Sequence, residues 1–313
     1  MDIVLLFPGQ GSQKPGMGRD LAEAFPAARD VFARADEALE FPLSRLCFEG
    51  PADELTRTHN AQPALVAHGI AAWAATRDAI GASVVAAAGH SLGEFTAYAA
   101  ADSLSLDDAL RVVRRRGELM YESGIARPGA MAAVIGDISR PIEDICAEAT
   151  REAGLVVPAN YNSPGQLVLS GEISGVERAM ALCKDAGAKR AVRLNVSGAF
   201  HSPLMETASR GLAQVLDSVA FADPHFMVYA NVDGSPVRDA ERAKELLLRQ
   251  LSSPVRWIDE VQAITASYPD ALYIEMGPGS VLVGLVRKIA PAAKTMTCGT
   301  AAEVNQLAEL ATA

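Results

Sequence analysis

A serine between two glycines, in the stretch AAAGHSLGEFTAY that begins at Ala86, has the clearest potential for chemistry in this chain. GHSLG fits the pattern G-x-S-x-G, in which a serine stands on a sharp turn between a strand and a helix. The apolar run VVAAAG (84–89) predicts the strand, and a helical pattern leaves from Glu94. We therefore interpret Ser91 as a nucleophile, with the backbone N–H of Leu92 facing a developing oxyanion. The alternative is a serine that only caps a helix.

A serine nucleophile needs a base, and the chain has five histidines. His90 adjoins the serine, but neighbouring side chains diverge at such a turn. His68 lies among alanines in a helical segment and is expected to pack in the core. His201 lies in NVSGAFHSPLM, a glycine-containing loop that can bring its side chain over the edge of a sheet. We expect His201 to accept the serine proton, with His225, which follows a proline at the start of a strand, as the main competitor.

Three consecutive arginines occupy the helical segment DDALRVVRRRGELMYES (107–123). At 100° per residue, the apolar residues of this segment define one arc of the helix. Arg116 falls inside that arc, Arg114 lies at its edge and Arg115 lies on the opposite side. Because an arginine on a buried face needs an anionic partner, Arg116 is expected either to form a structural salt bridge or to bind an anion.

Composition limits the class of protein. Half of the 313 residues are hydrophobic and 21% are charged, which is typical of a globular enzyme. The net charge of −10 argues against nucleic acid as the main partner, and no apolar run approaches the roughly 20 residues of a membrane helix. The start, MDIVLLFPGQ, resembles a first strand rather than a signal peptide. Four scattered cysteines without metal-like spacing predict reduced thiols and a cytoplasmic protein.

Apolar runs alternate with helical patterns, which predicts an α/β fold with a largely parallel sheet. IVLLF (3–7) is expected to be its first strand, followed by one helix from about Arg19 to Leu39 and another from about Pro63 to Ile80. From 127 to 197 the order becomes strand–helix–strand–strand–helix–strand, the ferredoxin-like pattern. We therefore expect an inserted ferredoxin-like small subdomain at 127–197. The large subdomain, 1–126 with 198–313, would carry the parallel sheet and the nucleophile turn.

Six motifs occur in one order: FPGQGSQ (7–13), GHSLGE (89–94), RRG (115–117), GAFHSPLM (198–205), RQLSSPVRW (249–257) and EMGPG (275–279). Together they resemble the family of malonyl-CoA:acyl carrier protein transacylases, close to the acyltransferase domains of polyketide synthases. The resemblance implies an α/β-hydrolase-like large subdomain. It also implies transfer of a malonyl group from malonyl-CoA to the phosphopantetheine thiol of a holo acyl carrier protein in fatty-acid synthesis, through a malonyl-serine in a ping-pong reaction.

The resemblance also implies roles for individual residues. Ser91 and His201 match the catalytic dyad of the family, in which a backbone carbonyl orients the imidazole. Arg116 matches the arginine that binds the malonyl carboxylate. The backbone N–H of Gln10 would join that of Leu92 in the oxyanion hole.

Three further positions match the family's active site. Gln250 is expected to help position the histidine loop, and Gln62 to line the pocket. Phe200 would crowd an α-methyl group and so favour malonyl over methylmalonyl. Gly198 departs from the usual polyketide pattern, which favours a stand-alone fatty-acid enzyme.

An acidic carrier protein would need a basic surface on this acidic chain. Lys189 and Arg190 form one candidate cluster, and Arg287 and Lys288 form another. We expect the protein to need no metal or cofactor and to have no contact with a membrane. We also expect it to be a monomer. A trans-acting polyketide-synthase acyltransferase, a serine thioester hydrolase and a non-catalytic docking protein remain as alternatives.

Overall fold

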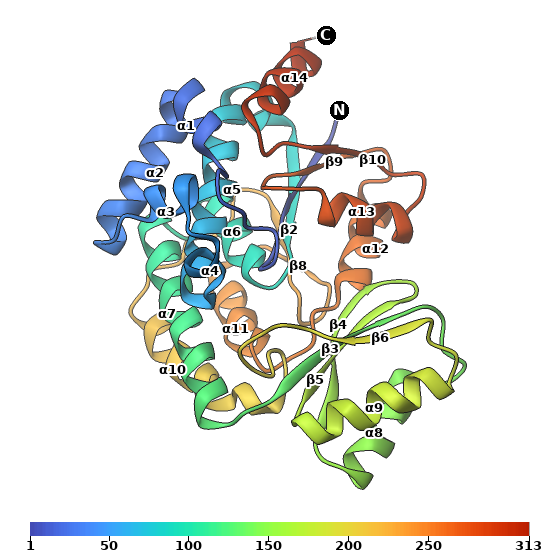
Figure 1. Cartoon of the computed structure of the whole chain (residues 1–313). Helices are drawn as coiled ribbons and strands as arrows, with labels where there is room; N and C mark the ends of the chain where they lie inside the picture. The colour runs from blue at the N-terminus through green and yellow to red at the C-terminus, as the bar shows by residue number, and fades with distance from the viewer. Residues whose placement is uncertain (313) are drawn as a thin grey trace.

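The structure, a computed structural model that describes residues 1–312, contains a six-stranded and a four-stranded sheet with separate sets of helices (Figure 1). The large sheet has the order β10-β9-β1-β2-β7-β8, and its strands are parallel except β8. Its strands are β1 Ile3–Phe7, β2 Val84–Gly89, β7 Met227–Tyr229, β8 Pro236–Val237, β9 Leu272–Glu275 and β10 Lys294–Thr297. The small antiparallel sheet has the order β4-β5-β3-β6, with β3 Ala130–Ile135, β4 Val156–Ser163, β5 Gln166–Gly171 and β6 Arg190–Arg193.

Helices pack on both faces of the large sheet and on one face of the small sheet (Figure 1). They are α1 Arg19–Ala24, α2 Pro26–Leu39, α3 Leu43–Glu49, α4 Ala52–Thr56, α5 Thr58–Ile80, α6 Leu92–Ala100, α7 Leu106–Ala126, α8 Ile142–Glu152, α9 Ile173–Asp185, α10 Glu206–Asp217, α11 Ala240–Gln250, α12 Trp257–Ser267, α13 Val281–Ile289 and α14 Ala301–Thr312, with short 3₁₀ turns at Gly81–Ser83 and Pro203–Met205. No helix within residues 1–312 is both long and apolar enough to cross a bilayer.

The central position of strand β1 in the sheet explains why the run IVLLF contains no polar residue. Leu5 and Phe7 face the core formed with α2, α5, α6 and α7, whereas Val4 and Leu6 face the core formed with α12 and α13. A central parallel strand is covered on both faces, so both sets of alternating side chains must be apolar.

Parallel pairing brings the turns after four strands to one edge of the large sheet. Phe7 at the end of β1 is level with Gly89 at the end of β2, and Tyr229 at the end of β7 is level with Ala88. Strand β9 ends beside β1, with Glu275 opposite Leu6. The segments that follow these strands therefore meet at the carboxyl edge, where open α/β sheets bind their ligands.

The small sheet lies over this edge (Figure 1). On one face, Ala132, Val134 and Leu169 pack against α8 and α9. On the other face, Met131 and Val168 line a cavity that reaches Ser91. The two sheets thus enclose one site between them.

Two helix boundaries differ from those predicted. The single helix expected from Arg19 to Leu39 is two helices, because the chain is extended at Phe25 and Pro26 begins a new helix at its first position. The helix expected from Pro63 starts earlier, at Thr58. Proline has no N–H to donate to the carbonyl four residues before it, and the His59 carbonyl instead accepts a bond from Arg114 (3.1 Å).

Candidate active site

The turn that carries Ser91 depends on close backbone contacts. Ser91 has φ 52° and ψ −105°, a strained conformation for a residue with a side chain. A Cβ on Gly89 would lie 1.9 Å from the carbonyl carbon of Gly93, and a Cβ on Gly93 would lie 2.0 Å from the oxygen of Phe7. The two glycines flanking the serine are thus required by the close approach of β1, β2 and α6.

His201 contacts the serine as a hydrogen-bond partner. The Ser91 Oγ and His201 Nε2 atoms are 2.7 Å apart, and Nδ1 lies 3.1 Å from the carbonyl oxygens of Gln250 and Ser253. Because a carbonyl only accepts, Nδ1 carries the ring proton and Nε2 is left to accept one from Ser91. Burial, and then the positive charge of Arg116, lower the pKa of His201 to about 3. The imidazole is therefore neutral at neutral pH, with Nε2 free to accept a proton.

Arg116 lies beside the serine with only 1% of its surface exposed. Its Nη2 donates to Ser91 Oγ (3.0 Å) and to Gln250 Oε1 (3.0 Å), and its Nη1 donates to Gln62 Oε1 (2.9 Å). Burial lowers the pKa of Arg116 to about 10, opposed by the charge of Glu94, so the guanidinium remains a cation at neutral pH. Its three partners are neutral, which leaves it able to bind an anion at the serine.

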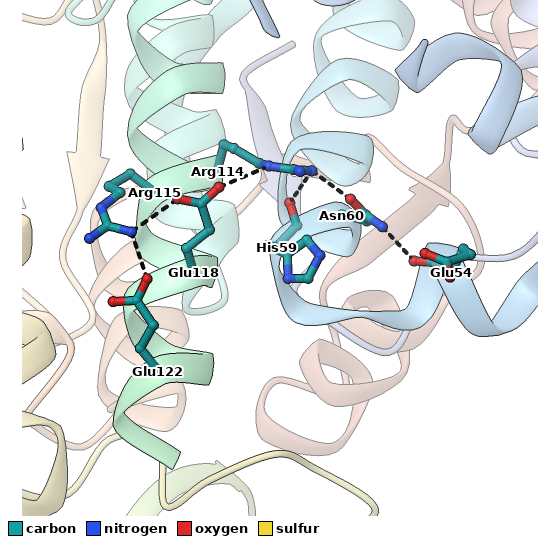
Figure 2. A network of polar contacts seen from close by, with 7 residues as sticks. All are labelled: Glu54, His59, Asn60, Arg114, Arg115, Glu118 and Glu122. Carbon is teal, nitrogen blue, oxygen red and sulfur yellow. Dashed lines mark hydrogen bonds and ion pairs between the residues drawn. The ribbon is translucent and has the colours of Figure 1, made fainter. Parts of the chain in front are cut away.

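The two neighbouring arginines are occupied elsewhere, as Figure 2 shows. Arg114 donates to the backbone oxygen of His59 and to the side chain of Asn60. Arg115 donates to Glu118 (3.1 Å) and Glu122 (2.9 Å) on its own helix. Of the three arginines, Arg116 is thus the one whose guanidinium reaches the serine.

The backbone N–H groups of Gln10 and Leu92 have no hydrogen-bond partner among residues 1–312. The side chain of Gln10 donates to Thr58 Oγ1 (3.3 Å). Both residues line the cavity next to Ser91. Unpaired N–H groups at a strand-to-helix turn can donate to an oxyanion.

The cavity above Ser91 has a volume of about 350 Å³. Apolar side chains from the small sheet, from α6, α7 and α13 and from the loop before His201 form most of its wall, with Phe200 next to His201. Gln62 and Gln250 lie beneath it, buried against Arg116. The backbone carbonyl of Gln250 accepts from His201 Nδ1, and its side chain contacts Ser91, Glu94 and Arg116.

Three buried residues beneath the serine were missed in the sequence: Glu94, Asn231 and Glu260. Asn231 accepts a bond from the Ser91 N–H (2.7 Å) and donates to Glu260. Glu94 accepts from Gln250 (2.6 Å). Glu94 stands in the first turn of a helix, where an acidic residue is ordinary; Asn231 and Glu260 carry no motif that would have marked them.

Among residues 1–312, no other histidine has a hydrogen bond to the Ser91 hydroxyl. His90 is half-buried, lines the cavity and contacts Asn162 (2.8 Å), whereas His68 is buried and contacts the Gly299 carbonyl (3.0 Å). His225 is exposed and pairs with Asp102. His59 is partly buried beside Arg114 and Tyr121.

The four basic residues expected to dock a carrier protein lie away from Ser91 and are all exposed. Lys189 and Arg190 stand at the start of β6, and Arg287 and Lys288 stand in the last turn of α13. Lys288 donates to Gln166 (3.3 Å), which lines the cavity. Lys288 therefore lies beside the cavity wall, whereas Arg287 donates to Thr295 (2.9 Å).

The described part of the chain has no cluster of side chains that resembles a metal site. Among residues 1–312, no three histidine, cysteine, aspartate or glutamate side chains are placed to hold a metal ion. The four cysteines are buried and unpaired. The arrangement is suited to nucleophilic attack by Ser91. The neutral imidazole of His201 would accept the serine proton, and the buried guanidinium of Arg116 would bind an anionic part of the substrate.

Residues 4–304 match the family described as the acyl transferase domain. Malonyl CoA-acyl carrier protein transacylase from Bacillus subtilis is 46% identical over 294 residues, which cover 94% of this chain and 92% of that protein. The crystal structure of an acyl-carrier-protein S-malonyltransferase from Bartonella henselae superposes with a TM-score of 0.94, at 42% identity and full coverage of both chains. A malonyl-transacylase solved in complex with a type II polyketide-synthase acyl carrier protein gives a TM-score of 0.93 at 40% identity, covering 99% of this chain and 100% of that chain.

Proposed function

This chain belongs to the acyl transferase family, and we propose that it transfers the malonyl group of malonyl-CoA to the phosphopantetheine thiol of an acyl carrier protein in fatty-acid synthesis. One observation carries the proposal: the buried guanidinium of Arg116 donates to the hydroxyl of the nucleophilic serine (3.0 Å). A serine hydrolase does not need a cation at this place, whereas an acyl group that ends in a carboxylate does.

In the first half of the reaction, Ser91 Oγ attacks the thioester carbon and its proton passes to His201 Nε2. The carbonyl oxygen becomes an oxyanion, and the N–H groups of Gln10 and Leu92 donate to it. When the intermediate collapses, the C–S bond breaks and His201 returns the proton to the CoA sulfur. CoA leaves, and malonyl-Ser91 remains.

The second half runs the same steps in reverse with a different thiol. The carrier thiol gives its proton to His201 and attacks the malonyl ester, and Ser91 leaves with that proton. The substrates thus bind in turn, as in a ping-pong reaction. Because a side chain or a backbone N–H is assigned to each step, we expect no metal or cofactor to take part.

Substrate choice rests on Arg116 and Phe200. Arg116, held by Gln62 and Gln250, would bind the malonyl carboxylate while the thioester lies at Ser91. Phe200 is buried in the cavity wall next to the base, where an α-methyl group would meet its ring. Malonyl is therefore favoured over methylmalonyl, and Gly198 favours a stand-alone fatty-acid enzyme over a polyketide-synthase acyltransferase.

The carrier protein would approach the cavity mouth. Lys288 at Gln166 would supply positive charge beside the cavity, with the exposed Arg287 next to it in the chain, and Lys189 and Arg190 would supply it at the start of β6. An acidic carrier protein would be attracted to these groups despite the net charge of −10. A related transacylase was solved with its carrier protein, which supports this partner.

The chain divides, in this proposal, into an α/β-hydrolase-like large subdomain (1–126 and 198–313) and a ferredoxin-like small subdomain (127–197). The strand order β4-β5-β3-β6, with two helices on one face, supports the second assignment. The serine turn at the carboxyl edge of a parallel sheet supports the first. We expect a cytoplasmic monomer, in keeping with four unpaired thiols.

Intact-protein mass spectrometry tests the transfer. The protein is mixed with malonyl-CoA, with and without holo acyl carrier protein, and Ser91→Ala serves as the control. We expect a malonyl adduct that is absent from the control and that moves to the carrier. Release of free malonate at the same rate with and without the carrier would instead identify a thioester hydrolase.

A further inference from the structure

The backbone of Ser91 is held on both sides by buried amide side chains. The Ser91 N–H donates to Oδ1 of Asn231 (2.7 Å), and the Ser91 carbonyl accepts from Nε2 of Gln250 (2.9 Å). Both amides come from the second half of the chain, about 140 and 160 residues after the serine. The strained residue thus has each of its backbone polar groups bonded to a distant side chain.

Asn231 also spans the turn. Its Nδ2 donates to the Gly89 carbonyl (2.7 Å) and to both carboxyl oxygens of Glu260 (3.1 and 3.2 Å). Because the Gly89 carbonyl only accepts and the Ser91 N–H only donates, Nδ2 must face the carbonyl and Oδ1 must face the Ser91 N–H. Glu260 adds two contacts to Nδ2 that hold the amide in this orientation.

Glu94 does the same for the second amide. Its Oε2 accepts from Nε2 of Gln250 (2.6 Å), so that Oε1 of Gln250 is turned to Arg116 (3.0 Å). The same Glu94 oxygen accepts from the backbone N–H of Asn231 (3.2 Å), which joins the two amides in one network.

Both glutamates are fully buried, and burial raises the pKa of each, that of Glu94 to about 7. Burying two carboxyl groups beneath one serine costs free energy unless they are hydrogen-bonded, and here both bond to the amides that hold the serine backbone. Strained backbone conformations persist where the surrounding contacts over-determine them.

We propose that Asn231 is a positioning residue for acyl transfer, holding Ser91 in its reactive conformation, and that Glu260 and Glu94 set the orientation of the two amides that grip the serine backbone. This inference deepens the proposed function and rests on it only in taking Ser91 as the nucleophile.

The test uses phenylmethylsulfonyl fluoride, a reagent that reacts with an activated serine and carries no carboxylate. The rate constant of sulfonylation is measured per titrated active site for Asn231→Leu. Asn60→Leu is the matched control, because Asn60 is also a buried amide bonded to a backbone carbonyl and a charged side chain, but near Arg114 (Figure 2). We expect the rate constant of Asn231→Leu to fall by about 100-fold, as a misplaced reacting group does, and that of Asn60→Leu to match the wild type.

A second variant decides the case if Asn231→Leu does not fold. Glu260→Met keeps the length of the side chain and removes both oxygens that accept from Asn231, and its rate constant should fall by about tenfold. A rate constant within twofold of wild type in whichever variant folds overturns the proposal, since a merely structural role would lower the number of active sites and leave their rate unchanged. Failure of malonyl-CoA to acylate the wild type would overturn the proposed function and leave this result standing.

Discussion

Replacing Arg116 by alanine should remove the preference for a malonyl group while leaving the serine reactive. The substitution deletes the bond to Ser91 Oγ for every acyl donor, so that loss cancels when two donors are compared. A donor with a carboxylate additionally loses a buried cationic partner. Breaking a buried ion pair costs about 3–5 kcal/mol, which corresponds to roughly 10²- to 10⁴-fold in rate.

The measurement is the acylation rate constant of Ser91 with malonyl-CoA and with acetyl-CoA, followed by rapid quench and mass spectrometry. We expect the ratio of the two constants to fall by at least about 100-fold in Arg116→Ala. Acetyl-CoA should still acylate the variant, because the contact of 2.7 Å between Ser91 and His201 does not involve the guanidinium.

Arg115→Ala is the matched control. It removes the same charge from the next position of α7, where Arg115 pairs with Glu118 and Glu122 (Figure 2). The ratio should not change in this variant. If Arg116→Ala keeps a malonyl-to-acetyl ratio within threefold of wild type, the guanidinium does not select the substrate and the reasoning is wrong.

Four further outcomes follow from the same geometry. Gly93→Ala places a Cβ 2.0 Å from the Phe7 oxygen and should lower the free energy of unfolding by about 3 kcal/mol; a urea midpoint equal to wild type would contradict the close contact. With the pKa of His201 lowered to about 3, the sulfonylation rate should stay nearly constant from pH 7 to 5, whereas a histidine with its ordinary pKa would give a fall of roughly 30-fold. Between pH 7 and 5 the unfolded chain binds a proton at His201 and the folded chain does not. The contribution of His201 to the free energy of unfolding should therefore fall by roughly 2 kcal/mol as the pH is lowered from 7 to 5. The variant His201→Gln should lack this pH dependence. Phe200→Ser should raise the methylmalonyl-to-malonyl ratio of kcat/KM by at least about tenfold, and an unchanged ratio would show that the ring does not crowd the α-carbon.

Local sterics and periodicity made parts of this site predictable. The glycines around Ser91 mark a turn that only small neighbours permit, and the structure has the strand and the helix on either side of it. The helical wheel placed Arg116 on the buried face of α7, where it lies. The same reasoning passed over Pro26, whose place at the first position of α2 marks a helix start inside the segment expected to be one helix.

Other parts depend on contacts that no local pattern records. Asn231 reaches the serine because β7 pairs with β2, and Glu260 on α12 contacts Asn231 from there. A short polar residue after a strand is common, so nothing in the segment YANVDG separates an amide that holds a nucleophile from one that caps a turn. Likewise, the role of Gln250 could be expected from the family, but its bond to Glu94 could not.

The position of β1 between β2 and β9 has a consequence for synthesis on the ribosome. The first strand is made at residues 3–7, while its partner β9 is made at residues 272–275. At a translation rate of roughly 5–20 residues per second, about 10 to 50 s pass between the synthesis of β1 and that of β9. One edge of β1 is unpaired during this time. During this interval an apolar strand edge is open to other chains. The emerging protein is thus exposed to aggregation until nearly the whole chain has been translated, so a slow codon or a chaperone acting late in translation should affect its yield more than one acting early.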